Sequence, residues 1–182
     1  MAEELNEEII IAGFGGQGVL SMGMLLVYAG MVEGKNVSWL PSYGPEMRGG
    51  TANCNVILSD GMVGSPVISK ADSLIVMNQP SLEKFESFVK PGGRILVNSD
   101  LVDKKVTRSD VEAVYLPVNF TAQACGNDKA ANVVMMGAYT ALTGFPGKEA
   151  VHQAFEKVFG PKKAHLIPLN EEAFAKGQEL VQ

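Results

Sequence analysis

The chain has 182 residues, of which 46% are hydrophobic and 19% are charged, and its formal net charge is -5 at pH 7. A single domain of this length buries about 70% of its unfolded surface, so it needs neither disulfides nor a metal to form a core. The acidic composition, with a pI near 5.1, argues against nucleic acid or an anionic membrane as the main partner. We therefore expect one globular domain over residues 1–182, and the high apolar content indicates that another chain covers part of its surface.

The sequence lacks the residue patterns of several kinds of chemistry. Its two cysteines, Cys54 and Cys125, form no C-x-x-C pair for zinc or an iron–sulfur cluster, and we expect both to be buried thiols. His152 and His165 are isolated from other ligand-type residues, so no metal site is expected. Neither a nucleophile elbow nor a Walker lysine is present. Because the chain shows no apolar signal core and no apolar run of about 18 residues, we expect a cytoplasmic protein.

An apolar run that ends in a glycine-rich loop dominates the first part of the sequence. The β-branched residues 9–11 predict a strand buried on both faces, and the loop GFGGQG at residues 13–18 leads into a helix. Glycines let the backbone approach a ligand, and the first turn of a helix offers unpaired N–H groups, so an anionic group is the natural ligand. The alternative is a tight strand-to-helix turn without a ligand.

The same loop satisfies the dinucleotide-binding pattern G-x-G-x-x-G through Gly13, Gly15 and Gly18. That pattern also needs an acidic residue about 20 positions later, which holds a ribose hydroxyl. Residues 38–43 contain neither aspartate nor glutamate. The sequence therefore disfavours nicotinamide binding, although a Rossmann-like start to the fold is expected.

A helix is predicted over residues 19–33, where Leu20, Met24, Val27 and Met31 form one apolar face. Strands are predicted at residues 36–40 and 51–59. The dipeptide at residues 60–61, Asp-Gly, predicts a hairpin whose second strand covers residues 62–69 at the edge of the sheet.

The rest of the chain alternates between strands and helices. Strands are predicted at residues 73–77, 94–97 and 111–116, with a helix that begins at Pro80 and uses Val89 on its inner face. Helices follow at residues 120–144, in two pieces with Asn127 or Asp128 as the second cap, and at residues 148–159 and 171–181. The small residues within 130–137 favour close packing on another helix. This order predicts an α/β fold: one three-layer domain with a mixed, mainly parallel sheet and a β-hairpin.

A second informative segment is SYGPEMRGG, at residues 42–50. It combines a proline, three glycines, Tyr43, Glu46 and Arg48. A loop of this composition can direct a guanidinium group and backbone donors toward a carboxylate or a phosphate. The alternative is a surface turn in which Arg48 pairs with Glu46.

The two segments GFGGQG and YGPEMRGG, in this order and spacing, resemble the gamma subunit of the 2-oxoacid:ferredoxin (or flavodoxin) oxidoreductases. The resemblance covers nearly the whole chain and includes the S-D-G turn at residues 59–61 and the P-G-G turn at residues 91–93. Residues 43–50 are more similar to the 2-oxoglutarate branch of this family than to the pyruvate branch.

The resemblance implies a noncatalytic gamma subunit of a complex that converts 2-oxoglutarate and coenzyme A to succinyl-CoA, carbon dioxide and reduced ferredoxin or flavodoxin. The isolated chain is expected to be inactive. Thiamine diphosphate and iron–sulfur clusters are expected on partner subunits of the alpha, beta and delta types. Coenzyme A is the expected shared substrate.

Candidate residues for contact with coenzyme A come from both glycine-containing segments. We expect backbone and amide donors of the first segment near a phosphate, and the Arg48 guanidinium against a phosphate or a substrate carboxylate. The candidate binding residues are Gly13, Gly15, Gly16, Gln17, Gly18, Tyr43, Arg48, Gly49 and Gly50. Neither a catalytic residue nor a metal ligand is expected in this chain.

Three alternatives remain open at this point. In the first, the substrate of the complex is pyruvate or a branched-chain 2-oxoacid. In the second, the chain is a free-standing dinucleotide-binding oxidoreductase. In the third, it is a scaffold whose glycine loop only packs against a partner.

Overall fold

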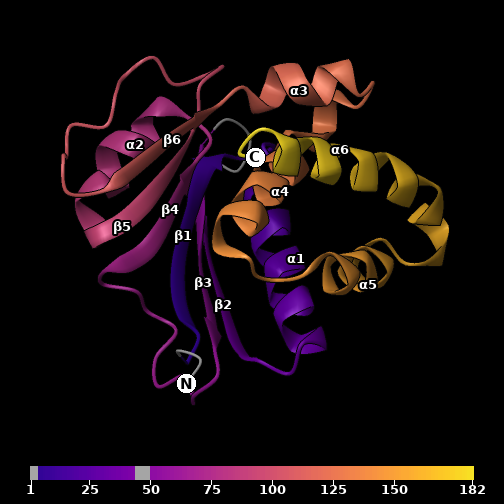
Figure 1. Ribbon diagram of the computed structural model, residues 1–182, viewed down its shortest axis with the longest axis horizontal. Helices are drawn as coiled ribbons and strands as arrows, with labels where there is room; N and C mark the ends of the chain where they lie inside the picture. Colours follow the sequence, from indigo (N-terminus) through magenta and orange to yellow (C-terminus); the bar gives the residue numbers. More distant parts are fainter. Residues whose placement is uncertain (1–3, 44–49) are drawn as a thin grey trace.

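The computed structural model describes residues 4–43 and 50–182, without the side chain of Tyr43 (Figure 1). The strands are β1 (Asn6–Phe14), β2 (Asn36–Tyr43), β3 (Thr51–Ser59), β4 (Ala71–Val76), β5 (Val89–Asn98) and β6 (Glu112–Leu116). The α-helices are α1 (Val19–Val32), α2 (Gln79–Phe85), α3 (Val118–Ala124), α4 (Ala131–Thr143), α5 (Lys148–Phe159) and α6 (Ile167–Glu179). Short 3-10 segments are η1 (Glu86–Phe88), η2 (Asp128–Ala130) and η3 (Pro161–Leu166). None of the described helices is long and apolar enough to cross a membrane.

The strands form one mixed sheet in the order β2-β3-β1-β4-β5-β6. The pairs β1–β4, β4–β5 and β5–β6 are parallel, whereas β3 is antiparallel to both β1 and β2. The chain leaves β1 through α1 toward one edge of the sheet and leaves β4 through α2 toward the other edge. In open α/β sheets, ligands bind outside the carboxyl ends of the strands at such a change of direction. The loop that follows β1 lies at this point.

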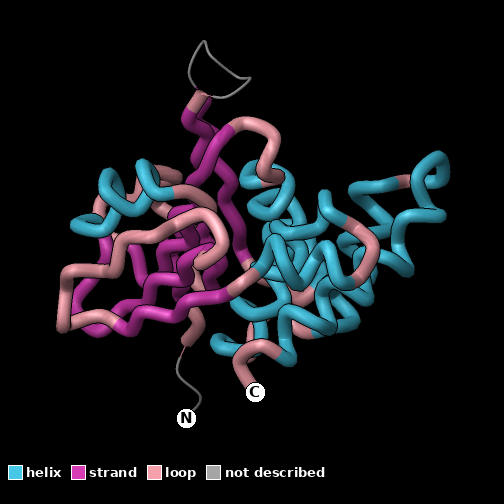
Figure 2. The backbone as a smooth tube through the Cα atoms, turned by 90° about the horizontal axis from the view of Figure 1, so that it is seen from above, coloured by secondary structure: helices cyan, strands magenta, loops and turns pink. Residues whose placement is uncertain are grey.

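Helices cover both faces of the sheet, which makes the three-layer α/β domain expected from the sequence. Figure 1 shows α1, α4, α5 and α6 on one face and α2 on the other, and Figure 2 shows most of the helices on one side of the strands. Successive residues of β1 contribute to the two cores in turn: Ile9 and Ile11 pack in the core that contains α1 and α4, and Ile10 packs in the core that contains Leu82 of α2. The first strand is therefore buried on both faces, as predicted.

Helices α4 and α6 pack with their backbones in unusually close contact. A Cβ atom on Gly177 would lie 1.9 Å from the carbonyl oxygen of Val134, and one on Gly137 would lie 2.1 Å from that of Phe174. This contact confirms the close helix packing predicted from the small residues of α4.

Residues 62–69 do not form the edge strand predicted from the Asp60-Gly61 dipeptide, and they have no regular structure. Both edges of β3 are already occupied, by β1 and by β2, so a further strand has no place to pair. Asp60 instead ends β3: its carboxylate accepts a hydrogen bond from the Leu5 N–H at 2.7 Å and pairs with Lys35 Nζ at 2.5 Å. The antiparallel pair of consecutive strands in the fold is β2–β3.

The predicted helix after Gly18 is confirmed, but its apolar face is not the one that the spacing indicated. Met22 and Leu26 are fully buried, whereas Met31, on the predicted face, is 54% exposed. Gly23 and Gly30 lie on the buried side, where they let α1 approach β2 and β3. Leu20, Met24 and Val27 remain only partly buried.

Three other predicted boundaries also needed correction. Helix α2 ends at Phe85, so Val89 begins β5 and does not belong to the helix. Neither Asn127 nor Asp128 caps α4 through its side chain, because η2 precedes that helix. Helix α6 begins at Ile167, several residues before the predicted start.

Candidate functional site: the glycine loop and two adjoining cavities

The loop between β1 and α1 has a defined conformation that depends on glycine at two positions. Gly16 has φ 96° and Gly18 has φ 73°, values that other residues rarely adopt. The Gly15 N–H donates to the Gly50 carbonyl oxygen at 2.9 Å. The first glycine-containing segment and the end of the second are therefore in direct contact.

The side chain of Gln17 holds this loop against the sheet. Its Oε1 accepts a hydrogen bond from the Phe14 N–H at 2.6 Å, and its Nε2 donates to the Met77 carbonyl oxygen at 3.0 Å. One amide N–H is thus used within the chain, and the expected contact of Gln17 with a phosphate stays a prediction. Within the chain, this side chain connects the carboxyl ends of β1 and β4.

The first turn of α1 offers backbone donors beside the loop. Gly18 caps this helix without a side-chain hydrogen bond. Within the described part of the chain, the N–H groups of Val19, Leu20 and Ser21 have no backbone or side-chain acceptor, as expected for the start of a helix. Such unpaired N–H groups, together with the helix dipole, attract an anion.

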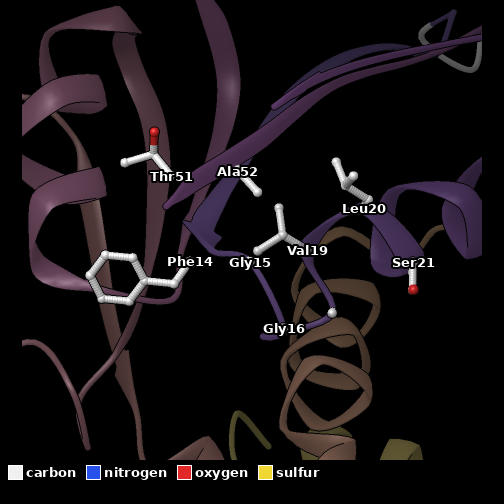
Figure 3. Close-up of a pocket in the computed structure, with 9 residues that line it drawn as sticks. Phe14, Gly15, Gly16, Val19, Leu20, Ser21, Thr51 and Ala52 are labelled. Atoms are coloured by element: carbon white, nitrogen blue, oxygen red, sulfur yellow. The ribbon is translucent and has the colours of Figure 1, made fainter. Parts of the chain in front are cut away.

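A cavity of about 290 Å³ lies on one side of this turn. Figure 3 shows Phe14 and Thr51 on one side of the cavity and Leu20 and Ser21 on the other. Gly15, Gly16, Gly18, Val19 and Ala52 complete its lining. The lining is mainly apolar side chains and glycine backbone, so it suits an uncharged chain that passes close to the backbone.

A second cavity, of about 470 Å³, lies on the other side of the same turn. It shares Gly16, Gly18 and Ser21 with the first cavity, and its remaining walls come from α1, η2 with the preceding Asn127, the start of α4, the end of α5, η3 and α6. Lys129 and Lys163 line it, and its other lining residues are Ser21, three asparagines, two glycines and apolar residues. Sequence reasoning missed both lysines, because they lie more than 100 positions after the loop and only the helix packing brings them to it.

The other predicted site residues are distributed as follows. Gly13 is the penultimate residue of β1, and a Cβ atom there would lie 2.7 Å from Gln17 Oε1. The backbone of Tyr43 pairs with Ala52, one of the residues that line the first cavity. Arg48 and Gly49 lie outside the described residues. The loop, Gly50 and the end of β2 therefore gather at the same end of the neighbouring strands β1, β3 and β2.

The two cysteine thiols differ in burial, and the buried one is held in its unreactive protonated form. Burial raises the pKa of the Cys54 thiol to about 12. Cys125 is partly exposed, which corrects the expectation that both thiols are buried. Among residues 4–43 and 50–182, no group of three or more histidine, cysteine, aspartate or glutamate side chains could hold a metal ion. With only two cysteines, this chain does not fit an iron–sulfur cluster.

Glu7 is a half-buried carboxylate on β1, well before the strand reaches the glycine loop. It accepts hydrogen bonds from Ser73 Oγ at 2.5 Å and Tyr139 OH at 3.2 Å, and Arg94 Nη1 lies 3.7 Å away. Burial raises the pKa of Glu7 despite these partners. The cluster joins β1, β4, β5 and α4, so we interpret it as structural.

Comparison with known proteins identifies the relatives of this chain. The pyruvate ferredoxin/flavodoxin oxidoreductase family matches residues 8–180. The chain is 42% identical to the ketoisovalerate oxidoreductase subunit VorA of Methanothermobacter thermautotrophicus, over 93% of this chain and 35% of that protein. It is 34% identical to the 2-oxoglutarate synthase subunit KorC of Methanocaldococcus jannaschii, over 98% of this chain and 96% of that protein. The chain therefore spans about a third of VorA and nearly all of KorC.

A solved structure has the same fold as this chain. The 2-oxoglutarate:ferredoxin oxidoreductase from Magnetococcus marinus, with 2-oxoglutarate, coenzyme A and succinyl-CoA bound, superposes with a TM-score of 0.88 at 25% identity. The match covers 98% of the present chain and 31% of that longer chain.

Proposed function

The chain belongs to the pyruvate ferredoxin/flavodoxin oxidoreductase family, and we propose that it is the noncatalytic gamma subunit of a 2-oxoacid:ferredoxin (or flavodoxin) oxidoreductase complex. In this role it completes the complex and contributes part of the coenzyme A binding surface. The complex oxidatively decarboxylates a 2-oxoacid and transfers the acyl group to coenzyme A. Thiamine diphosphate and the iron–sulfur clusters belong to the alpha, beta and delta-type partners, and they supply the carbanion and electron-transfer chemistry there.

One observation carries the coenzyme A part of this proposal: unpaired N–H groups at the start of α1 lie between two cavities. Coenzyme A is a long molecule with a pyrophosphate between its nucleotide and its pantetheine arm. A pyrophosphate at the first turn of α1 would meet backbone donors and the positive end of the helix dipole. The adjoining apolar cavity then accommodates the uncharged pantetheine arm. The Magnetococcus relative has coenzyme A bound in its complex, which supports this choice of ligand.

The second glycine-containing segment adds a positive charge to the same region in our proposal. Gly50 contacts Gly15, so the segment reaches the loop at its carboxyl end. A guanidinium at Arg48 would bind a phosphate or a substrate carboxylate through two hydrogen bonds. Tyr43 and Glu46 orient that segment or contact the catalytic subunit.

For the 2-oxoacid, we propose 2-oxoglutarate, because the sequence of residues 43–50 resembles the 2-oxoglutarate branch and because the KorC relative matches nearly end to end. A specific observation favours a second candidate: the higher identity is to a ketoisovalerate oxidoreductase subunit. Purification of the native complex, followed by assays with 2-oxoglutarate, ketoisovalerate and pyruvate, separates these candidates. Activity confined to 2-oxoglutarate supports the first choice, and preference for a branched-chain 2-oxoacid overturns it.

The complex carrying Arg48→Ala tests the contribution of this chain to coenzyme A binding. We expect a higher Michaelis constant for coenzyme A, while subunit composition stays the same. A scaffold without ligand contact predicts the reverse, namely weaker assembly and an unchanged Michaelis constant in the surviving complex. Tight, saturable binding of a nicotinamide or flavin nucleotide to the purified chain would instead favour the free-standing oxidoreductase.

A further inference from the structure

Helix α3 presents an exposed aromatic side chain at the end of the sheet that carries the glycine loop. Strands β1 and β6 run in the same direction, so α3, which follows β6, lies at the same end of the sheet as the loop that follows β1 (Figure 1). Val118 and Ala122 of α3 are buried, whereas Phe120, two residues from each, is 69% exposed. Residues two apart lie on opposite sides of a helix, so the ring of Phe120 faces away from the core.

A cavity of about 310 Å³ adjoins this ring and has an acidic rim. It is lined by Asp100, Asn119, Phe120, Gln123 and Asp128. The ion pairs found among the described residues include neither aspartate, so this rim carries a local negative potential. The next residue after Asp100 is also apolar and 48% exposed. We call this surface the α3 patch, and it consists of Asp100, Leu101, Phe120, Gln123 and Asp128.

Hydrogen bonds to the end of β5 hold the α3 patch in a fixed geometry. Asp100 Oδ2 accepts from the Phe120 N–H at 2.8 Å. Asn98, which is fully buried at the end of β5, donates through Nδ2 to Asn119 Oδ1 at 2.8 Å. Within the described part of the chain, Asp100 Oδ1 and the carboxylate of Asp128 receive no hydrogen bond. A fixed aromatic ring beside free carboxylates matches a lysine or arginine side chain, which binds both the ring face and the carboxylates.

We propose that the α3 patch docks onto the catalytic partner subunit, with a lysine or arginine of that subunit in the acidic cavity and an apolar side chain against Phe120. The inference rests on the proposed function. In that function, coenzyme A lies at this end of the sheet and its thiol reaches an acyl group held by the partner, so the partner faces the same end. The negative rim selects a basic partner surface by charge complementarity. Exposed aromatic residues are also enriched at the centres of protein interfaces.

The size of two relatives supports a partner of this kind. The matching region is only 35% of VorA and 31% of the Magnetococcus chain. In both proteins it is therefore covalently joined to a much longer piece of chain. The present chain has no such connection within its 182 residues, so a non-covalent surface is needed to hold it against the partner.

The test is a competition between wild-type and variant chains for the same partner subunits. Both chains, with different tags, are co-expressed with the alpha, beta and delta-type partners, and their ratio in the purified complex is measured by mass spectrometry. Phe120→Ala should enter the complex at least about tenfold less than the wild type. Asp100→Asn combined with Asp128→Asn should enter it about 3-fold to 10-fold less. Asparagine at residue 100 keeps an oxygen that accepts the Phe120 N–H, so the double variant tests charge without loss of that hydrogen bond.

Met62→Ala is the matched control, because Met62 is 95% exposed and follows β3, at the other end of the sheet from α3. It should enter the complex as often as the wild type. Equal incorporation of Phe120→Ala and the wild type, or better incorporation of the double asparagine variant, overturns the inference. Failure of the proposed function has a different signature, because the wild-type chain itself would then not copurify with the partner subunits.

Discussion

Replacing Gly18 by alanine should destabilise the protein more than replacing Gly16, although both glycines have positive φ and lie in the same loop. A Cβ atom on Gly16 would have no neighbour within 4 Å, whereas one on Gly18 would lie 2.4 Å from Asn132 Nδ2. The left-handed backbone alone costs an alanine roughly 1–2 kcal/mol at either position. At Gly18, overpacking adds about 1–3 kcal/mol, and displacement of Asn132 adds about 1 kcal/mol for its hydrogen bond to the Gly18 carbonyl oxygen.

We therefore expect Gly16→Ala to reduce the free energy of unfolding by about 1–2 kcal/mol and Gly18→Ala to reduce it by at least about 3 kcal/mol. Urea denaturation of the purified chain, followed by circular dichroism, measures both values. In an Asn132→Ala background the two closest contacts, with Asn132 Nδ2 and Cγ, are absent and only Cβ remains, at 3.1 Å, so the extra cost of Gly18→Ala should largely disappear. Equal costs for Gly16→Ala and Gly18→Ala, or an unchanged cost in that background, would refute the proposed contact between the loop and α4.

Three further predictions concern packing and pH. Gly177→Ala should lower the stability by about 3 kcal/mol in thermal denaturation, because the new methyl group meets the Val134 backbone at 1.9 Å; an unchanged midpoint would show that α4 and α6 are not in backbone contact. Burial raises the pKa of Glu7, so its protonated form is favoured in the folded state. The free energy of unfolding of the wild type, relative to that of Glu7→Gln, should therefore fall as the pH rises above about 4. A relative stability of the wild type that increases with pH would contradict this. The hydrogen bond to Glu171 raises the pKa of His152. His152→Gln should therefore be less stable than the wild type at pH values below the unfolded-state pKa of about 6.5, and the two should become equally stable as the pH rises through the folded-state pKa. An equal loss of stability at low and high pH would exclude the ion pair.

Local patterns in the sequence predicted those elements of the fold that local interactions decide. The β-branched run at Ile9, the alternation after Thr51 and the small residues of α4 each led to the observed element. The strand predicted at residues 62–69 failed because strand pairing is not local, and β3 already has two partners. Periodicity also cannot tell which of two apolar faces of α1 is buried. That choice depends on Gly23 and Gly30, which let the helix approach β2 and β3.

The candidate site was predictable only in part for the same reason. The glycine loop is a continuous motif, and its strand–loop–helix setting follows directly from the sequence. The role of Gln17 was not predictable, because its partner Met77 lies at the end of a different strand. Lys129 and Lys163 carry no sequence motif, and the packing of α4, α5 and α6 beside α1 brings them to the loop.

The role of the first turn of α1 in coenzyme A binding can be measured most directly with a change of charge at Ser21. Ser21 is exposed and lines both cavities. Ser21→Glu introduces a carboxylate of the same size as the amide in Ser21→Gln, and a carboxylate in the first turn of a helix does not weaken the helix. The test compares the Michaelis constants of the Ser21→Glu and Ser21→Gln complexes for coenzyme A and for the 2-oxoacid.

Repulsion between a unit charge and a phosphate at contact distance near a protein surface is worth a few kcal/mol at most, and about 1.4 kcal/mol already changes binding tenfold. We predict that Ser21→Glu raises the Michaelis constant for coenzyme A at least about tenfold relative to Ser21→Gln, with little change for the 2-oxoacid and no loss of stability. Equal Michaelis constants for coenzyme A in the two variants would contradict the placement of the pyrophosphate at the start of α1.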